Sequence, residues 1–331
     1  MRPASVIDSD AGSVEYEGRQ FFAGLVVRAC AVRFAVGHGS VLTGPRLRHT
    51  MQRLGPDDGT MTESTHHLAA IAWLSIAALA LPAWIAYCWS RTSFSLVQLC
   101  LSFLATLLVR LLWGTRRTGK FPLAKGQGVV VVCNHRSSID PFFFQTCLTW
   151  PSHWMVAKEY FSHAFFRWFL KQAECIPTNR GGVDTAATKG AIRLAEEGGV
   201  VGMFPEGRIN MTDALMLPGR PGAVLVALKA RVPILPCYIQ GSPFAGTVWS
   251  PLTMTAKVQM KFGKLIDLSP YFGRESDEGL MPELMLRCLR EIGKLAGHDD
   301  YEPQLAGKKW KPSKEEVSNH VAALTARQAV G

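Results

Sequence analysis

The sequence predicts an α/β domain, with a mixed sheet flanked by helices on both faces, that follows an N-terminal membrane-embedded two-helix segment. Two observations predict this fold class. Short β-branched strands alternate with helical segments across residues 125 to 270, which is the pattern of an α/β sheet. Two long apolar segments precede them and carry almost no charge, which is typical of helices in a membrane.

Composition restricts the class of partner. The chain has 331 residues, 48% of them hydrophobic, and a formal net charge of +10. This charge favours an anionic partner, and no basic run with interleaved aromatic residues occurs, so we expect a membrane or a phosphorylated substrate and no nucleic acid. The eight cysteines have no metal-ligand spacing, so we expect reduced thiols and no metal site.

We divide the chain into four parts. Residues 1–60 are rich in Gly, Arg and small residues, and we expect a disordered extension or a region upstream of the true start, with a targeting peptide as the alternative. Residues 61–113 form the membrane helical hairpin and residues 114–297 the main domain. Residues 298–331 turn polar and are predicted to be a tail.

The two apolar segments differ in length. Leu68 to Trp89 has no charged residue and would reach roughly 33 Å as a helix, enough to cross a bilayer core. Phe94 to Val109 is marginal for a full span, so the pair could cross as a hairpin or lie in one leaflet. Core helices of a soluble domain are the alternative. Basic residues follow and place the main domain on the cytoplasmic side, at the inner membrane if the cell is bacterial: Arg110, Arg116, Arg117, Lys120 and Lys125.

A strand, a turn and a helix are predicted in succession across residues 129–144. Four valines and a cysteine form a strand that is buried on both faces. Asn134 and His135 follow at its carboxyl end, where ligands gather in open α/β sheets. Asp140 and Pro141 look like the N-cap and first residue of a helix. Asp140 could fold back and hold the His135 imidazole as a general base, and the alternative is a simple cap beside a turn histidine.

The remainder of the main domain alternates strands with helices. Further strands are predicted at residues 154–157, 176–180, 199–204, 233–240 and 255–262. Helices are predicted at residues 159–171, 184–197, 222–231 and 278–295. The first of these helices is dense in aromatic residues, which favours a core or membrane-facing surface over an acyl pocket.

Charged residues follow three of these strands. Lys158 follows the predicted strand at residues 154–157. Arg180 ends the strand at residues 176–180, beside a glycine pair, and Glu206-Gly207-Arg208 comes just after the strand at residues 199–204. An arginine can grip a phosphate bidentately, and Gly207 allows a positive φ or a close backbone approach. Solvated turns and an ordinary Glu-Arg pair are the alternatives.

Four motifs in fixed order resemble the glycerolipid acyltransferase family, which includes the 1-acylglycerol-3-phosphate acyltransferases. They are Asn-His-x-x-x-x-Asp at residues 134–140, Ile-Pro-Thr-Asn-Arg at 176–180, Phe-Pro-Glu-Gly-Arg at 204–208 and Val-Pro-Ile-Leu-Pro at 232–236. The resemblance covers residues 114 to 297. It implies an O-acyltransferase that moves a fatty acyl group from acyl-CoA or acyl-acyl-carrier-protein to lysophosphatidic acid, giving phosphatidic acid, with no other cofactor and with membrane lipids around it.

The resemblance also implies a role for each site residue. His135 takes the hydroxyl proton and Asp140 orients the His135 imidazole, as in other catalytic histidine–carboxylate pairs. Arg180 and Arg208 bind the phosphate of the acceptor, and Glu206 and Gly207 shape its glycerol end. The remaining residues are assigned to the substrate site (Asn134 and Lys158) or to the acyl-donor pocket (Pro233, Ile234 and Pro236).

Other functions have specific requirements. Many lysophosphatidate acyltransferases carry a threonine between the glycine and the arginine of the third motif, whereas Arg208 follows Gly207 directly here. Another lysophospholipid, for example lysophosphatidylethanolamine, is therefore the alternative acceptor. A serine hydrolase would need Gly-x-Ser-x-Gly, which the sequence lacks. A non-catalytic membrane scaffold is the third alternative, and the oligomeric state is not predicted.

Overall fold

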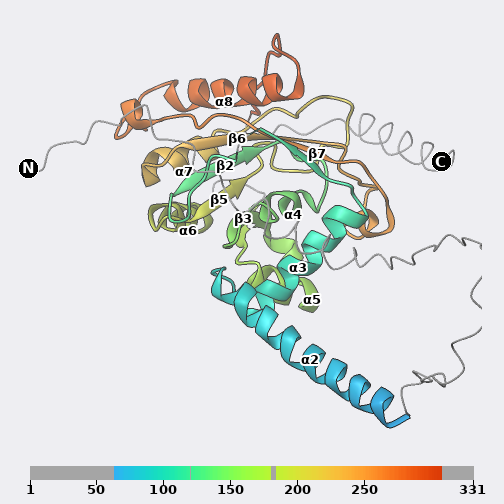
Figure 1. Cartoon of the computed structure of the whole chain (residues 1–331). Coiled ribbons are helices and arrows are strands. Elements are labelled where there is room, and N and C mark those ends of the chain that lie inside the picture. Colours follow the sequence, from blue (N-terminus) through green and yellow to red (C-terminus); the bar gives the residue numbers. More distant parts are fainter. Residues whose placement is uncertain (1–62, 120, 180–183, 308–331) are drawn as a thin grey trace, which may run out of the picture. The chain divides into compact units, whose positions relative to one another are not determined.

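The computed structural model of the chain describes residues 63–119, 121–179 and 184–307 (Figure 1). The predicted extension at residues 1–60, the predicted phosphate ligand Arg180 and the end of the predicted tail lie outside the described residues.

The described strands form a seven-stranded mixed sheet. Its order is β1-β7-β6-β2-β5-β3-β4. All neighbouring strands are parallel except β6 and β7, which are antiparallel. The strands are β1 (Arg116–Thr118), β2 (Val129–Cys133), β3 (Ser152–Ala157), β4 (Ile176–Thr178), β5 (Val200–Met203), β6 (Ile234–Gln240) and β7 (Gln259–Phe262). The prediction of a mixed sheet is confirmed, while β1 was not predicted.

Helices cover both faces of the sheet because buried side chains alternate along its strands. In β2, Val130 and Val132 belong to one core cluster, whereas Val129, Val131 and Cys133 belong to the other. The first cluster includes residues of α6 (Thr185–Glu196), α7 (Gly222–Ala230) and α8 (Leu280–Ala296). The second includes residues of α3 (Leu96–Leu111) and α4 (Asp140–Gln145). The prediction of helices on both faces is therefore confirmed.

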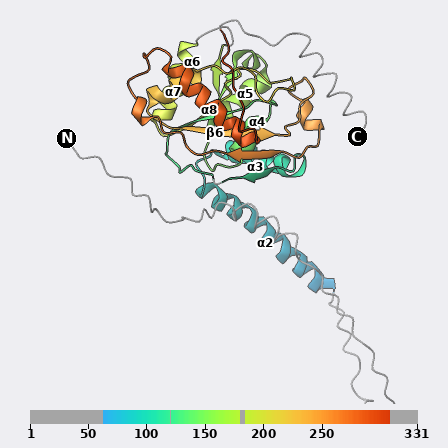
Figure 2. The same ribbon diagram turned by 90° about the horizontal axis from the view of Figure 1, so that it is seen from above.

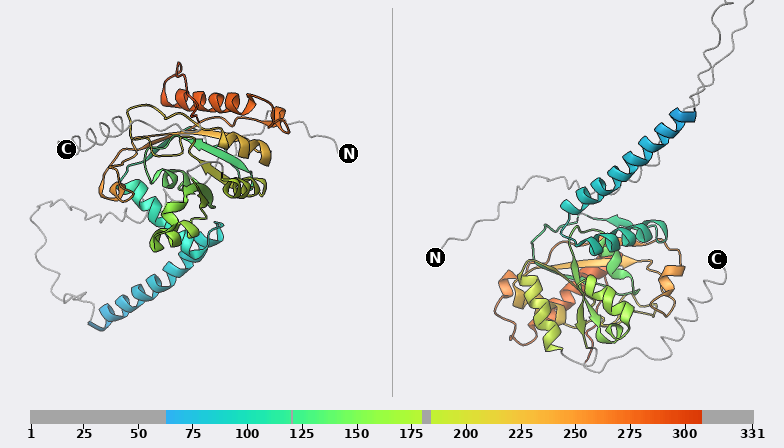
Figure 3. Two further views of the ribbon diagram at one scale, coloured as in Figure 1. Left: turned by 180° about the vertical axis from the view of Figure 1, so that it is seen from behind. Right: turned by 90° about the horizontal axis from the view of Figure 1, so that it is seen from below.

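The figures show the two layers directly. In Figure 1, α8 lies on one side of the sheet and α3 and α4 lie on the other. Figure 2 looks onto the first layer with α8 in front, and this helix packs against β6. The view from behind shows the same order of layers (Figure 3). The carboxyl ends of β2, β5, β3 and β4 therefore meet at one edge, since these strands are parallel neighbours.

The prediction of one continuous helix at residues 159–171 is wrong. The structure has a 3-10 helix, η1 (Lys158–Phe161), and then α5 (Ala164–Gln172). Ser162 ends η1, because its N–H (3.3 Å) and its hydroxyl (2.6 Å) both donate to the carbonyl of Glu159. His163 is extended, with φ −80° and ψ 130°, and breaks the helical run.

The strand predicted at residues 255–262 is shorter than expected. Only β7, the last four residues, pairs as a strand. The N–H groups of Ala256 and Val258 donate instead to the carbonyls of Leu112 and Trp113, each at 3.0 Å. This segment therefore links the end of α3 to the edge of the sheet.

The two N-terminal apolar helices have different surroundings. In the described part of the chain, α2 (Glu63–Ser90) is the one helix long and apolar enough to cross a membrane, by length and composition. Its Trp84 lies edge-to-face on Phe103 of α3 at 6.3 Å between ring centroids. The 16-residue α3 is shorter and begins with a capping box at Ser95. Its other end is part of the domain, since Val109 is buried in the core beside α4.

Residues 298–307 pack on the main domain. Gly219 donates its N–H to the carbonyl of Gln304 (2.8 Å) and accepts from the N–H of Ala306 (2.9 Å). Tyr301 lies so close to α8 that a Cβ on Gly293 would be 2.7 Å from its Cβ. The described part of the predicted tail is therefore part of the domain.

Gly202 in β5 makes room for a large aromatic side chain. It is the register partner of Trp154 in β3, and a Cβ at Gly202 would lie 2.3 Å from Cδ2 of that ring. Trp154 in turn stacks on Phe204, with ring centroids 4.7 Å apart. The glycine therefore lets Trp154 lie across the strand and support Phe204.

We expect Gly202→Ala to lower the free energy of unfolding by about 1–3 kcal/mol, because the added methyl group must displace a close-packed ring. Gly190→Ala in α6 is the matched control, since no atom lies within 4 Å of its added Cβ. It should raise stability by up to about 1 kcal/mol through helix propensity. Denaturant unfolding measures both, and equal changes would mean that Trp154 moves aside without cost.

Candidate active site

His135 follows β2, and its backbone is fixed on both sides. Its N–H donates to Oε1 of Glu206 at 2.7 Å, and its carbonyl accepts from the N–H of Asn210 at 2.7 Å. Both partners belong to the segment after β5, the neighbouring strand. The position of the imidazole therefore depends on the turn after β5.

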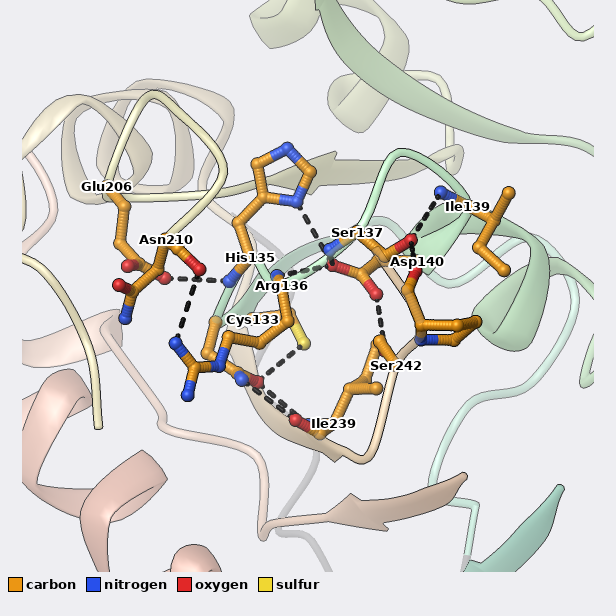
Figure 4. Close-up of polar contacts among 12 residues, drawn as sticks. Cys133, His135, Arg136, Ser137, Ile139, Asp140, Glu206, Asn210, Ile239 and Ser242 are labelled. Atoms are coloured by element: carbon orange, nitrogen blue, oxygen red, sulfur yellow. Dashed lines mark hydrogen bonds and ion pairs between the residues drawn. The ribbon is translucent and has the colours of Figure 1, made fainter. Parts of the chain in front are cut away.

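Asp140 is fully buried and holds the imidazole in one orientation (Figure 4). Its Oδ2 lies 3.1 Å from Nδ1 of His135 and accepts from the N–H groups of Arg136 (2.7 Å) and Ser137 (2.8 Å). Its Oδ1 accepts from the hydroxyl of Ser242 at 2.6 Å. An N–H on Nδ1 that donates to this carboxylate leaves Nε2 of a neutral ring able to accept a proton.

The predicted N-cap role of Asp140 is wrong. The N-cap of α4 is Ile139, which makes no side-chain cap hydrogen bond, and Asp140 lies in the first turn. The carboxylate points back toward the turn at residues 135–137 because the donors there occupy it. The predicted contact between Asp140 and His135 is present.

An aromatic stack covers one face of the imidazole. The ring of His135 lies parallel to that of Phe204, with centroids 3.8 Å apart and an interplanar angle of 7°. Phe204 stacks on Trp154 behind it. The His135 side chain is 16% exposed. Figure 4 shows its second ring nitrogen, Nε2, pointing away from Asp140.

Glu206 connects two loops, and its role at the glycerol end of the acceptor stays a prediction. It is 1% exposed, and its Oε2 accepts from the N–H of Leu217 at 2.7 Å while Oε1 accepts from that of His135. Burial raises the pKa of Glu206 to about 8. The hydrogen bonds from the backbone N–H groups of Leu217 and His135 act in the opposite direction and lower this pKa. Both oxygens are used within the protein, so Glu206 positions the catalytic turn.

Asn134 also has a structural role, and its assignment to the substrate site stays a prediction. It is 1% exposed. Its Oδ1 accepts from the N–H of Ile239 at 2.7 Å, and its Nδ2 donates to the carbonyl of Ile239 at 2.8 Å. The amide therefore extends the pairing of β2 with β6 by one step, and this fixes the residue that precedes His135.

Gly207 and Arg208 form the turn beside the histidine. Gly207 has φ +68°, so the prediction of a positive φ is confirmed. Arg208 is half-buried. A second guanidinium lies here as well, because a Cβ on Gly207 would be 3.3 Å from Nη1 of Arg220. The turn after β5 therefore brings cationic groups to the edge of the sheet where His135 lies.

Lys158 lies at the carboxyl end of β3, on the same edge of the sheet. Its Nζ is 3.4 Å from Oδ2 of Asp184, the residue that caps α6 as predicted, and its side chain is 48% exposed. Arg180, between β4 and α6, lies outside the described residues. The roles of both residues in substrate binding stay predictions.

The fourth motif lies in the core. Ile234 is 1% exposed and belongs to the cluster beneath α7 and α8. Pro236 is buried within β6, and Pro233 just before this strand is half-buried. In the described structure Ile234 and Pro236 therefore support the central strand, and the assignment of Pro233, Ile234 and Pro236 to the acyl-donor pocket stays a prediction.

Sequence reasoning missed several residues that build the site. Ser242 follows β6 after Gly241, and the rule that located His135 at a strand end also applies to it. Arg136 donates from Nη1 to the carbonyl of Thr212 at 2.7 Å and holds the loop after β5. Nothing in the local sequence pattern indicates the stacking partner of His135, because Phe204 reaches it only through the pairing of β5 with β2.

The chain is similar to known acyltransferases. Residues 115–240 match the family model described as Acyltransferase. The 1-acyl-sn-glycerol-3-phosphate acyltransferase of Bacillus subtilis is 28% identical over 182 residues, which cover 54% of this chain and 88% of that protein. The enzyme of the same name from Streptococcus pneumoniae is 28% identical over 193 residues, or 54% of this chain and 67% of that protein.

A solved structure is also similar. The crystal structure of the 1-acyl-sn-glycerophosphate acyltransferase from Thermotoga maritima has a TM-score of 0.48 and 19% sequence identity, over 71% of this chain and 98% of that one. The family match covers the segment that carries His135 and Asp140. Residues 115–240 therefore match the Acyltransferase family, and the chain is similar to the two bacterial enzymes of that kind.

Proposed function

We propose that this protein transfers a fatty acyl group from a thioester donor to the free hydroxyl of lysophosphatidic acid, giving phosphatidic acid, at a membrane. One observation carries the proposal: Asp140 holds Nδ1 of His135, so that Nε2 is left to take a proton. The names of the two bacterial relatives support the choice of acceptor.

The chemistry needs a base and no covalent nucleophile. His135 Nε2 takes the proton of the acceptor hydroxyl as its oxygen attacks the thioester carbon. The carbon–sulfur bond then breaks, and the imidazolium returns the proton to the leaving thiolate. Asp140 stabilises the imidazolium between these two steps. In the described residues, no serine or cysteine is hydrogen-bonded to the ring, which supports direct attack by the acceptor.

The acceptor phosphate would bind beside Gly207. Arg208 follows this glycine and the guanidinium of Arg220 lies next to it, on the sheet edge that also carries His135. A guanidinium binds phosphate through two parallel hydrogen bonds. Arg180 is assigned to the same phosphate by the order of the motifs. A lysophospholipid with another headgroup, such as lysophosphatidylethanolamine, stays the alternative acceptor because Arg208 follows Gly207 directly.

Membrane attachment would come from α2. The most apolar 18-residue window of its span from His66 to Ser90 has a mean hydropathy of 2.1, and none of this window is buried in the described structure. The membrane would then supply the water-insoluble acceptor to the catalytic domain on the cytoplasmic side. Acyl-CoA or acyl-acyl-carrier-protein would arrive from solution.

We expect His135→Ala to lower the rate of acyl transfer about 10²-fold to 10⁴-fold and to leave the fold intact, because general-base catalysis typically accelerates a reaction by this factor. Asp140→Asn should cost several orders of magnitude as well, since it removes the orienting charge. Labelled acyl-CoA and lysophosphatidic acid measure the rate. His163→Ala, at the N-cap of α5, is the matched control and should keep its activity. More than about a tenth of the activity in His135→Ala would rule out the base.

Arg208→Lys and Arg180→Lys should raise the KM for the lysophospholipid about tenfold to a hundredfold and leave the KM for the acyl donor unchanged. The physical reason is that lysine keeps the charge but loses the two-point contact, and a charged hydrogen bond contributes roughly 1.5–3 kcal/mol. Steady-state kinetics with each substrate varied in turn measures this. A rise in the donor KM alone would reverse the assignment of the two substrates.

The protein should stay with the membrane pellet in 1 M salt, because apolar insertion is not screened as surface charge is. Leu74→Arg combined with Leu79→Arg should weaken this retention, since each arginine costs about 2.5–3.5 kcal/mol near the centre of a membrane helix. Both leucines are more than two thirds exposed, at 70% and 73%, so the change should leave the domain folded. Release of the unmodified protein by salt alone would show that its basic surface holds it.

A further inference from the structure

Three cations lie on one face of the sheet at its β1–β7 edge: Arg116, Lys257 and Lys261. Arg116 of β1 is the register partner of Gln259 in β7, and its N–H donates to the carbonyl of Val258 at 2.8 Å. Burial alternates along this segment, with Lys257, Gln259 and Lys261 on its more exposed side. Partners in parallel strands point to the same face, so Arg116 lies beside both lysines. We call these three residues the basic row.

The basic row has no counter-charge within the described part of the chain. None of its three side chains forms an ion pair or a hydrogen bond with another described residue. The sequence explains this, because no Asp or Glu occurs in residues 64–139 or 214–266, the two segments that meet at this edge. Like charges that lie close together favour binding of an anion. By contrast, other described cations each contact a carboxylate: Lys158, Arg193, Lys229, Arg274, Arg290 and Lys294.

The basic row begins at the edge of the sheet where the catalytic pair lies. Gln259 is also the register partner of Gln240, the last residue of β6. Two residues further on, Ser242 donates to Oδ1 of Asp140 at 2.6 Å. β7 and β1 are two and three strand positions from β2, which at about 4.8 Å per strand is roughly 10–14 Å. An anion on the basic row therefore lies near His135 but not at the reacting atoms.

The position and length of the basic row indicate which anion fits. Lys257 and Lys261 are four residues apart in an extended segment, so their Cα atoms are separated by roughly 13 Å. A row of this length offers positions for more than one phosphate, and arginine and lysine both bind phosphate. The acceptor phosphate is only one glycerol away from the reacting hydroxyl, so it must bind closer to His135. A membrane surface would have no need to lie beside the catalytic edge.

The acyl donor has the required chemistry. Coenzyme A carries a diphosphate and a separate ribose phosphate on one nucleotide. Its pantetheine arm holds these phosphates away from the thioester, as the basic row is held away from His135.

We propose that the basic row binds the phosphate groups of coenzyme A when acyl-CoA is the donor. This assignment rests on the proposed acyl transfer, and it selects acyl-CoA over acyl-acyl-carrier-protein. The nucleotide lies on the β1–β7 edge, and the pantetheine arm spans the remaining distance to His135. The basic row is a donor subsite that is separate from Gly207 and Arg208, where the acceptor phosphate would bind.

The test compares two donors that differ only in the nucleotide part, acyl-CoA and the same acyl group on pantetheine. The triple variant Arg116→Gln, Lys257→Gln, Lys261→Gln should raise the KM for acyl-CoA about tenfold, since exposed charged contacts are individually weak but act together here. Its KM for acyl pantetheine should stay unchanged, because this donor has no phosphate. In the unmodified chain, the KM for acyl-CoA should rise with salt and that for acyl pantetheine should not.

A matched triple variant, Lys189→Gln, Arg231→Gln, Arg287→Gln, removes the same charge from exposed positions on α6, after α7 and on α8. It should keep both KM values. Isothermal titration calorimetry with free coenzyme A and the full-length chain in neutral detergent measures binding without catalysis. The variant of the basic row should lose about tenfold in affinity, and the matched variant should bind as the unmodified chain does. This measurement separates a failure of the subsite from a failure of the proposed reaction.

Four results would overturn the proposal. Equal increases in the KM of both donors would mean that the basic row acts through the fold. Equal effects of the two triple variants would mean general attraction to a basic protein. A higher KM for acyl-acyl-carrier-protein with an unchanged KM for acyl-CoA would assign the basic row to an acidic protein. Unchanged binding of coenzyme A together with weaker retention on vesicles of phosphatidylglycerol would assign it to the membrane.

Discussion

The carboxylate of Asp140 is buried, and it contacts hydrogen-bond donors from two segments that are distant from each other in the chain. His135, Arg136 and Ser137 approach it from the turn after β2, and Ser242 approaches it from the end of β6. Removing a charge from water is costly unless hydrogen bonds replace the lost solvation. The catalytic pair therefore requires that β2 and β6 end together, which makes it a product of the sheet and not of one loop.

Two further buried polar side chains support this arrangement. Asn134 extends the pairing of β2 with β6 through both polar atoms of its amide. Glu206 joins the N–H of His135 to that of Leu217 across the turn after β5. Phe204, from the same turn, covers the imidazole face. Three neighbouring strands therefore fix one ring, which lets its Nε2 meet a substrate without rearrangement of the site.

Much of the fold and part of the site could be predicted from periodicity and strand-end chemistry. The buried valine run predicted a strand covered on both faces, and the position of His135 after it predicted the edge where the site lies. The roles of Asn134 and Glu206 could not be predicted, because they depend on partners 105 and 71 residues away. The break at Ser162 depends on a side-chain hydrogen bond that helix periodicity does not report.

The central claim is that His135 acts directly on the acceptor hydroxyl, without a covalent acyl-enzyme. Intact-mass spectrometry of the purified full-length protein, incubated with acyl-CoA in the absence of any acceptor, tests this claim most directly. The account predicts an unchanged protein mass and no initial burst of free coenzyme A. A stoichiometric increase by the mass of one acyl group, removed when lysophosphatidic acid is added, would contradict it.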